Sequence, residues 1–102
     1  MRPSNKWTEV IDGKRYNCAT ATLIAGDDWW DGRNYERHGT NTFLFRTPKG
    51  AYFTCFLTQW QGERDRLNPV SQGDAIALYQ DELTEHYENF EDAFPGVVVE
   101  DA

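Results

Sequence analysis

The feature that most constrains this chain is an apolar stripe near its C-terminal end. Six apolar side chains follow one another there at steps of three or four residues: Ile76, Tyr79, Leu83, Tyr87, Phe90 and Phe94. This spacing is typical of a helix face packed on a core. Ser71 suits the helix start, because its hydroxyl can accept a backbone N–H, and Pro95-Gly96 suits the end. The pattern predicts either one continuous helix or two helices split near Thr84.

The same segment is strongly acidic. Residues 67–102 hold nine carboxylates and no Lys or Arg, whereas the first 66 residues hold ten basic and eight acidic residues, and the chain has a net charge of −7. Helical spacing would align Asp81, Glu85, Glu88 and Asp92 on one face. From the stripe and its neighbours we predict a partner-binding face made of Asp81, Glu82, Glu85, Glu88, Glu91 and Asp92.

Two interpretations of this acidic face remain open. It is either a solvated face that keeps a small domain soluble, or a negative surface that meets a basic partner. Carboxylates three or four residues apart on a helix lie ~5–6 Å from each other. Phosphates along one DNA strand have a comparable spacing, with a rise of ~3.4 Å per phosphate along the axis. The face could therefore occupy a nucleic-acid-binding groove of a protein partner.

Two hairpins are predicted before the helix. Trp7 to Ile11 and Lys14 to Tyr16 flank Asp12-Gly13, a strong signal for a tight hairpin turn. Thr42 to Arg46 and Ala51 to Gln59 flank a turn with Pro48 and Gly50 at favourable positions. We predict an α+β fold, with an antiparallel sheet of about four strands and one long or two short C-terminal helices packed on one face.

Side-chain alternation predicts which face of the sheet meets the helix. One face of the second hairpin carries Ala51, Phe53, Cys55 and Leu57, and we expect it to be the core face on which the helical stripe packs. The other face is amphipathic and could be half covered by the helix; it carries Tyr52, Thr54, Phe56 and Thr58. Three weaker expectations concern the rest of the chain. A strand should begin between Thr20 and Ala25, a polar loop should span Gln61 to Pro69, and Val97 to Val99 should form a short strand.

The length of 102 residues indicates one domain, with residues 1–66 mostly β and residues 67–102 an acidic helical segment. No apolar run approaches the ~20 residues of a membrane span, and the N-terminal residues lack the apolar core of a signal peptide. We therefore expect a cytoplasmic protein with no membrane partner. In that compartment Cys18 and Cys55 are expected to be buried thiols, with a disulfide as the less favoured alternative.

An aromatic contact patch is the alternative binding site. Trp29, Trp30 and Tyr35 stand in a stretch rich in Gly, Asp and Asn, which is typical of a loop. Together with Trp60 they are either core aromatics or an exposed patch for a small ligand, a peptide or nucleic acid. The sequence leaves both interpretations open.

No pattern for catalysis, metal binding or a cofactor stands out. His38 and His86 lie in no known catalytic frame, and Asp27, Asp28 and Asp31 have a carboxylate spacing that is bracketed by glycines. Six basic residues suit direct nucleic-acid binding: Arg33, Arg37, Arg46, Lys49, Arg64 and Arg66. The negative net charge opposes it, because phosphate binding is driven by cations that release counterions.

Two stretches carry a resemblance. Val10 to Ala25 and Leu44 to Phe53 resemble small uncharacterised proteins of bacterial mobile elements and phages, which share an I-x-G-K-x-Y opening, an L-[YF]-R-T-x-K-G-x-Y-F hairpin and an acidic helical tail. The chain departs from that pattern at Cys18, Phe45 and Pro48. The resemblance implies a mobile-element accessory protein. Together with the acidic tail it favours a non-enzymatic interaction protein, whose basic partner could be a host defence nuclease complex, as for an anti-CRISPR or DNA-mimic inhibitor. It implies no active-site residue.

Overall fold

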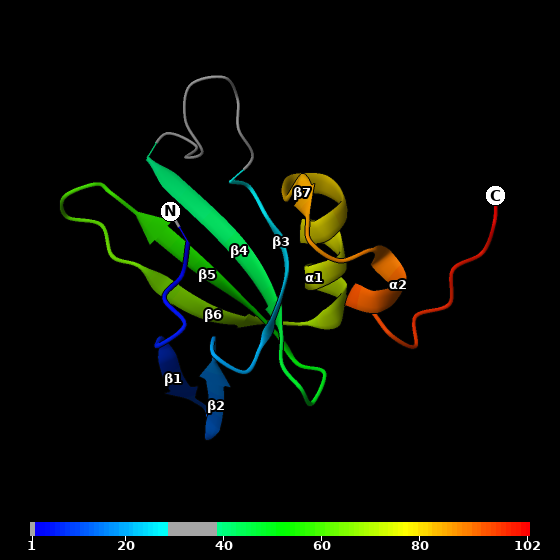
Figure 1. Cartoon of the computed structure of the whole chain (residues 1–102), viewed down its shortest axis with the longest axis horizontal. Helices are drawn as coiled ribbons and strands as arrows, with labels where there is room; N and C mark the ends of the chain where they lie inside the picture. Colours follow the sequence, from blue (N-terminus) through cyan, green and yellow to red (C-terminus); the bar gives the residue numbers. More distant parts are fainter. Residues whose placement is uncertain (1, 29–38) are drawn as a thin grey trace.

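The computed structural model of this chain describes residues 2–28 and 39–102. Its elements follow in the order β1 (Thr8–Ile11), β2 (Lys14–Asn17), β3 (Thr22–Gly26), β4 (Thr40–Arg46), β5 (Tyr52–Thr58), β6 (Arg66–Val70), α1 (Gln72–Ala77), the π-helical turn η1 (Leu78–Glu82), β7 (Glu85–His86) and α2 (Phe90–Ala93). The fold is α+β, as predicted (Figure 1). It has a five-stranded sheet and a separate two-stranded sheet in place of the expected sheet of about four strands.

The five-stranded sheet is antiparallel throughout, with the strand order β6-β5-β4-β3-β7. Strands β4 and β5 pair along their whole length, from Thr40 opposite Thr58 to Arg46 opposite Tyr52. The predicted hairpin around Pro48 and Gly50 is therefore confirmed. Strand β3 pairs with the other edge of β4. This confirms the strand that was expected to begin between residues 20 and 25.

The two-stranded sheet is the first predicted hairpin. Strands β1 and β2 pair from Thr8 opposite Asn17 to Ile11 opposite Lys14. Asp12 and Gly13 have φ angles of 52° and 76°. Two successive residues of positive φ make the tight turn whose twist matches that of paired strands, and Asp-Gly is a favoured pair for it.

Each face of the large sheet is covered by a different layer. One cluster packs α1, η1 and α2 on Leu44 and Tyr52, through residues such as Tyr79, Leu83 and Phe94. The other cluster packs the β1–β2 hairpin on the opposite face: Tyr16 and Cys18 with Phe43, Phe45, Phe53, Cys55, Leu57 and Leu67. The prediction that the helical stripe packs on the Phe53–Leu57 face is wrong, because the N-terminal hairpin occupies that face.

The predicted loop from Gln61 to Pro69 ends in a strand. Residues Arg66–Val70 form β6 at the edge of the sheet, with Leu67 opposite Cys55 and only 4% exposed. Asn68 and Pro69 disfavour strand structure, which is why the sequence suggested a loop. An edge strand tolerates Pro, because an N–H that faces away from the sheet is not needed for pairing.

The apolar stripe is divided among three elements, so the split near Thr84 is the correct alternative. Ser71 begins α1, and its hydroxyl accepts the Asp74 N–H at 3.1 Å, as predicted. The helical path ends at Leu83, whose φ and ψ of −96° and 94° are extended. The following residues return to the sheet, where the N–H groups of Tyr87 and Glu88 both donate to the Ile24 carbonyl.

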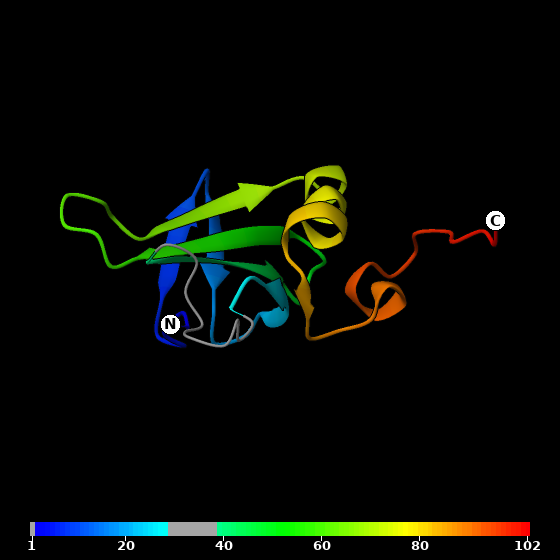
Figure 2. The ribbon, with the colours of Figure 1, turned by 90° about the horizontal axis from the view of Figure 1, so that it is seen from above.

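The C-terminal segment is therefore less helical than predicted. It contains β7 and most of β6, and its last residues have no regular structure, so the expected strand at Val97 to Val99 is absent from the described chain. Val98 is 82% exposed. The tail runs outward from α2, away from the sheet (Figure 2). Among the described residues no helix is both long enough and apolar enough to cross a bilayer.

Candidate interaction surface

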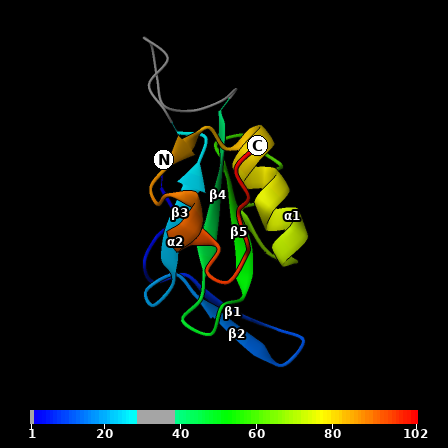
Figure 3. The ribbon, with the colours of Figure 1, turned by 90° about the vertical axis from the view of Figure 1, so that its right-hand side faces the viewer.

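The acidic segment forms one end of the molecule. Helix α1, β7, α2 and the C-terminal tail lie together on one side, and the β1–β2 hairpin lies away from them (Figures 1 and 2). A view from that end places α1, α2 and the tail in front of the sheet (Figure 3). We call this part of the molecule, residues 72–102, the acidic end.

The predicted stripe of four carboxylates is not one helical face, because the chain leaves the helix at Leu83. Asp81 lies in η1, Glu85 in β7 and Asp92 in α2, while Glu88 lies between the last two elements. The structure thus brings the predicted residues to one end through three short elements rather than one long helix.

Asp81 and Glu82 are carboxylates that the adjoining helix does not favour. Both are exposed and stand at the end of the α1–η1 helical path, which has no basic residue in its last turn. The C-terminal end of a helix carries partial negative charge, so carboxylates there oppose helix formation. Their presence therefore does not follow from the stability of this helix.

Glu91 and Asp92 have a local role besides any external one. They are exposed in the first turn of α2, where a negative charge is favourable. Asn89 caps this helix, its side-chain oxygen accepting the Asp92 N–H at 2.9 Å. The two carboxylates contribute to the charge of the surface, but helix α2 alone would favour them.

Glu88 is neutralised inside the molecule. Its carboxylate forms an ion pair with Arg46 at 2.8 Å, and the two side chains are only 22% and 19% exposed. The Arg46 guanidinium also donates to the carbonyls of Asp92 and Ala93. Arg46 therefore fastens the end of α2 to β4, and neither Arg46 nor Glu88 is available to an external partner.

Tyr79 is a buried residue of the acidic end, close to Glu88 and Glu91. Its hydroxyl donates to the Glu88 carbonyl at 2.7 Å, and its ring stacks on His86 with a centroid distance of 3.7 Å. Burial, together with the nearby carboxylates of Glu91 and Glu88, raises the pKa of Tyr79. A ring nitrogen of His86 contacts the Tyr79 carbonyl at 2.7 Å. His86 is thus a structural residue of this end, whereas His38 lies outside the described residues.

Of the predicted aromatic patch, only Trp60 lies among the described residues, and Trp29, Trp30 and Tyr35 do not. Trp60 is 56% exposed. Its indole lies against Gly39, where an added Cβ would come within 2.9 Å of the indole nitrogen. Gly39 also has a φ of 80°, so this position requires glycine for two reasons.

The Asp27 and Asp28 carboxylates, which were considered for metal binding, bind other residues of this chain. Asp27 accepts the Thr42 N–H at 2.8 Å. Asp28 is 6% exposed, pairs with Arg2 at 3.0 Å and accepts a hydrogen bond from the Tyr87 hydroxyl. Asp31 lies outside the described residues, and within them no group of three or more His, Cys, Asp or Glu side chains could hold a metal ion.

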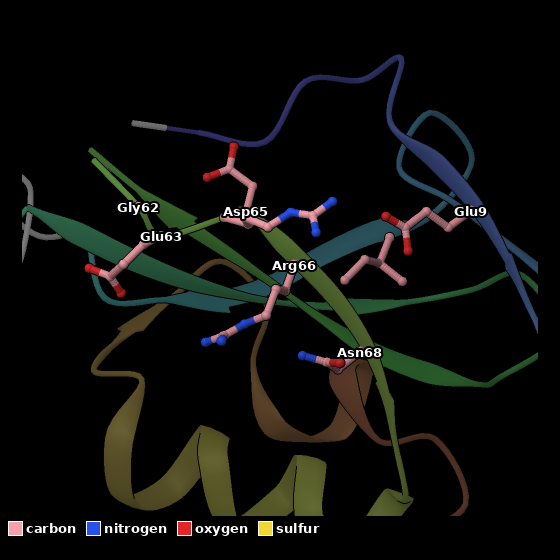
Figure 4. A pocket seen from close by; sticks show the side chains of 8 residues that line it. Glu9, Gly62, Glu63, Asp65, Arg66 and Asn68 are labelled. Carbon is pink, nitrogen blue, oxygen red and sulfur yellow. The ribbon is translucent and has the colours of Figure 1, made fainter. Parts of the chain in front are cut away.

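The basic residues considered for nucleic-acid binding are mixed with acids. Arg64 and Arg66 line a groove of about 510 Å³ beside the Glu9, Glu63 and Asp65 carboxylates (Figure 4). The Arg66 guanidinium lies over the Phe56 ring at 4.6 Å. Arg46 is bound to Glu88, as described above, and Arg33 and Arg37 lie outside the described residues. The described arginines thus form no continuous cationic surface.

Sequence reasoning missed contacts that tie distant segments together, of which two are examples. Arg46 and Glu88 are 42 residues apart, and Asp28 and Tyr87 are 59 apart. No spacing rule joins residues at such separations, and only the strand order of the sheet brings them into contact. Comparison of the chain with protein-family models, curated proteins and solved structures finds no match.

Proposed function

We propose that this chain is a non-enzymatic interaction protein, whose acidic end binds a basic surface of a protein partner. The observation that carries the proposal is the unneutralised charge of this end. Of the nine carboxylates in residues 67–102, Glu88 alone forms an ion pair with a basic residue of the described chain. The other eight have no such ion pair within residues 2–28 and 39–102, and Asp81 and Glu82 stand where the helix itself disfavours them.

The class of partner follows from charge, since the carboxylate spacing expected for one helical face does not apply once the chain leaves the helix at Leu83. A basic surface that accepts carboxylates in place of phosphates is the surface of a nucleic-acid-binding protein. We propose a partner of this kind, consistent with the mobile-element resemblance, in which the chain acts as a DNA mimic or anti-CRISPR-type inhibitor in the cytoplasm. The solvated-face interpretation predicts no such partner.

The test is a capture experiment with charge-neutral variants of the full chain. D81N/E82Q/E91Q/D92N removes four negative charges from the acidic end and replaces each side chain with one of similar shape. The matched control, N5K/T8K/T22K/Q61K, adds four positive charges at exposed positions outside the acidic end. Both variants change the net charge by the same amount, so only the position of the change differs.

We expect host proteins captured by the wild type to be retained by the control and lost with the neutralised variant. Duplex DNA should displace them, since it would compete for the same basic surface, and capture should weaken as salt rises. Capture that survives neutralisation, or that DNA does not affect, contradicts the proposal. The smaller D81N/E82Q variant separates loss of binding from loss of structure, because helix α2 is left unchanged.

A second candidate function rests on Trp60. The Trp60 side chain is 56% exposed, which suits a stacking contact, and its indole lies against Gly39, the first residue after the segment that holds Trp29, Trp30 and Tyr35. We propose an aromatic binding patch as the alternative. A change in Trp fluorescence on titration with single-stranded oligonucleotides or peptides, lost in W60L, would support it. Unchanged fluorescence across both panels would exclude it.

A further inference from the structure

The two cysteines form a buried pair. Cys18 lies in the turn after β2, and Cys55 lies in the middle of β5, 37 positions further along the sequence. Their sulfur atoms are 3.7 Å apart within the cluster that joins the β1–β2 hairpin to the sheet. Cys18 keeps 8% of its surface exposed and Cys55 none. Both are free thiols in this structure.

The two sulfur atoms are near each other, but not at bonding distance. A disulfide bond is about 2.05 Å long. The distance between the two sulfur atoms must therefore fall from 3.7 Å to that length. Cys55 is fixed, because β5 is paired on both sides, with Phe43 opposite it in β4 and Leu67 in β6. Cys18 can supply the movement, since it stands in a turn and is held by one backbone bond, from its N–H to the Trp7 carbonyl.

The two thiols differ in reactivity. The hydrogen bond from Cys55 lowers the pKa of the Cys18 thiol. The same hydrogen bond and burial raise the pKa of Cys55. The thiolate is the nucleophilic form of cysteine. Cys18 is thus both the more acidic thiol and the one that solvent reaches.

We propose that Cys18 and Cys55 are an oxidation site, at which a peroxide converts the two thiols to a disulfide. The Cys18 thiolate attacks one peroxide oxygen, the O–O bond breaks, and the other oxygen leaves as water after taking a proton. Cys18 is then a sulfenic acid. The Cys55 sulfur attacks the Cys18 sulfur, the S–O bond breaks, and a second water leaves with the Cys55 proton. In total, both sulfur atoms are oxidised and the peroxide is reduced to water.

The new bond would join the segment after β2 covalently to β5, in place of a hydrogen bond and packing. It would close a long loop across β3 and β4 and restrict the unfolded chain, which stabilises a protein more as the loop lengthens. We expect the melting temperature to rise by an amount on the order of 10 °C. The acidic end lies away from this site, so the inference stands apart from the proposed function.

The experiment treats the reduced full-length protein with stoichiometric hydrogen peroxide under native conditions. We expect the mass to fall by two hydrogen atoms, both thiols to resist alkylation after denaturation, and dithiothreitol to reverse both changes. The single variants assign the roles. C55S should accumulate a Cys18 sulfenic acid that dimedone traps, whereas C18S should leave Cys55 unmodified over the same time.

Three results would overturn the proposal. Both thiols could still alkylate after treatment, the mass could rise by oxygen atoms with no crosslink, or the disulfide could join two chains. Each of these shows that the neighbouring sulfur atoms do not react with each other. The wild-type mass measurement decides the question even if a Ser variant fails to fold.

Discussion

Arg46 is the residue on which the packing of the acidic end most depends. It neutralises Glu88 and binds the two carbonyls at the end of α2. Removing it leaves a half-buried carboxylate unpaired, so we expect Arg46→Met to lower the free energy of unfolding by about 2 kcal/mol. Urea denaturation measures this change. Arg64→Met, at an exposed position, is the control, and an equal loss in both variants would show that the Glu88 contact contributes nothing.

Tyr87 should give stability a distinct pH dependence. Burial and its hydrogen bond to the Asp28 carboxylate raise the pKa of Tyr87 above the ordinary value of 10.0. Below that value the phenol is protonated in both states, and the hydrogen bond contributes fully. Above it the unfolded chain loses its proton first, so this stabilisation is lost as the pH rises.

We therefore expect Tyr87→Phe to be about 2 kcal/mol less stable than the wild type at neutral pH, where the donor to Asp28 is lost. From about pH 9 to about pH 11 the gap should narrow, since only the wild type loses this contribution. Denaturant unfolding across that range measures both. If the difference in free energy of unfolding between the two proteins stays constant or widens, the pKa of Tyr87 is not raised in the folded state.

At the scale of elements, β6 is the strand that most needs an independent test. Its alternation buries Leu67 at 4% exposure, while Asn68 is exposed. Leu67→Ala should therefore cost about 3 kcal/mol, because it opens a cavity against Cys55 and its neighbours. Asn68→Ala should change stability by less than about 0.5 kcal/mol. Equal losses of stability in the two variants would indicate that residues 66–70 form a loop, as Asn68 and Pro69 suggest, and not a strand.

At the scale of the whole molecule, negative charge is concentrated at the acidic end, where Glu88 alone is paired with a described basic residue. Lys14, Arg15 and Lys49 line a cavity between the turns of the two hairpins. Such a distribution orients the molecule toward a charged partner and speeds association at low salt. It also leaves repulsion among the other carboxylates of the acidic end, since among the described basic residues only Arg46 pairs with one of them, Glu88.

This repulsion predicts that neutralisation stabilises the fold. D81N/E82Q should raise the melting temperature by roughly 2–4 °C at low salt, because it removes like charges from a helix C-terminal end. The gain should shrink near 1 M salt, where the Debye length falls to about 3 Å. Thermal unfolding at two salt concentrations measures it. A fall in melting temperature would mean that these carboxylates are satisfied within the chain, and the reason for an external basic partner would be gone.

The sequence by itself determined the features that depend on near neighbours. Alternation and turn residues predicted both hairpins, and Ser71 marked the start of α1, because side-chain period, turn conformation and capping are settled within a few residues. The concentration of carboxylates in the last third of the chain is likewise a property of sequence alone.

Only the tertiary structure decided how the helical stripe ends and what it covers. The stripe breaks at Leu83 because the chain beyond it bonds to the exposed edge of β3, where the Ile24 carbonyl accepts two N–H groups. The helices pack on the Tyr52 face because the N-terminal hairpin covers the Phe53 face, and both faces are apolar. Local pattern cannot choose between two apolar faces, since the choice depends on which distant segment buries more surface against each of them.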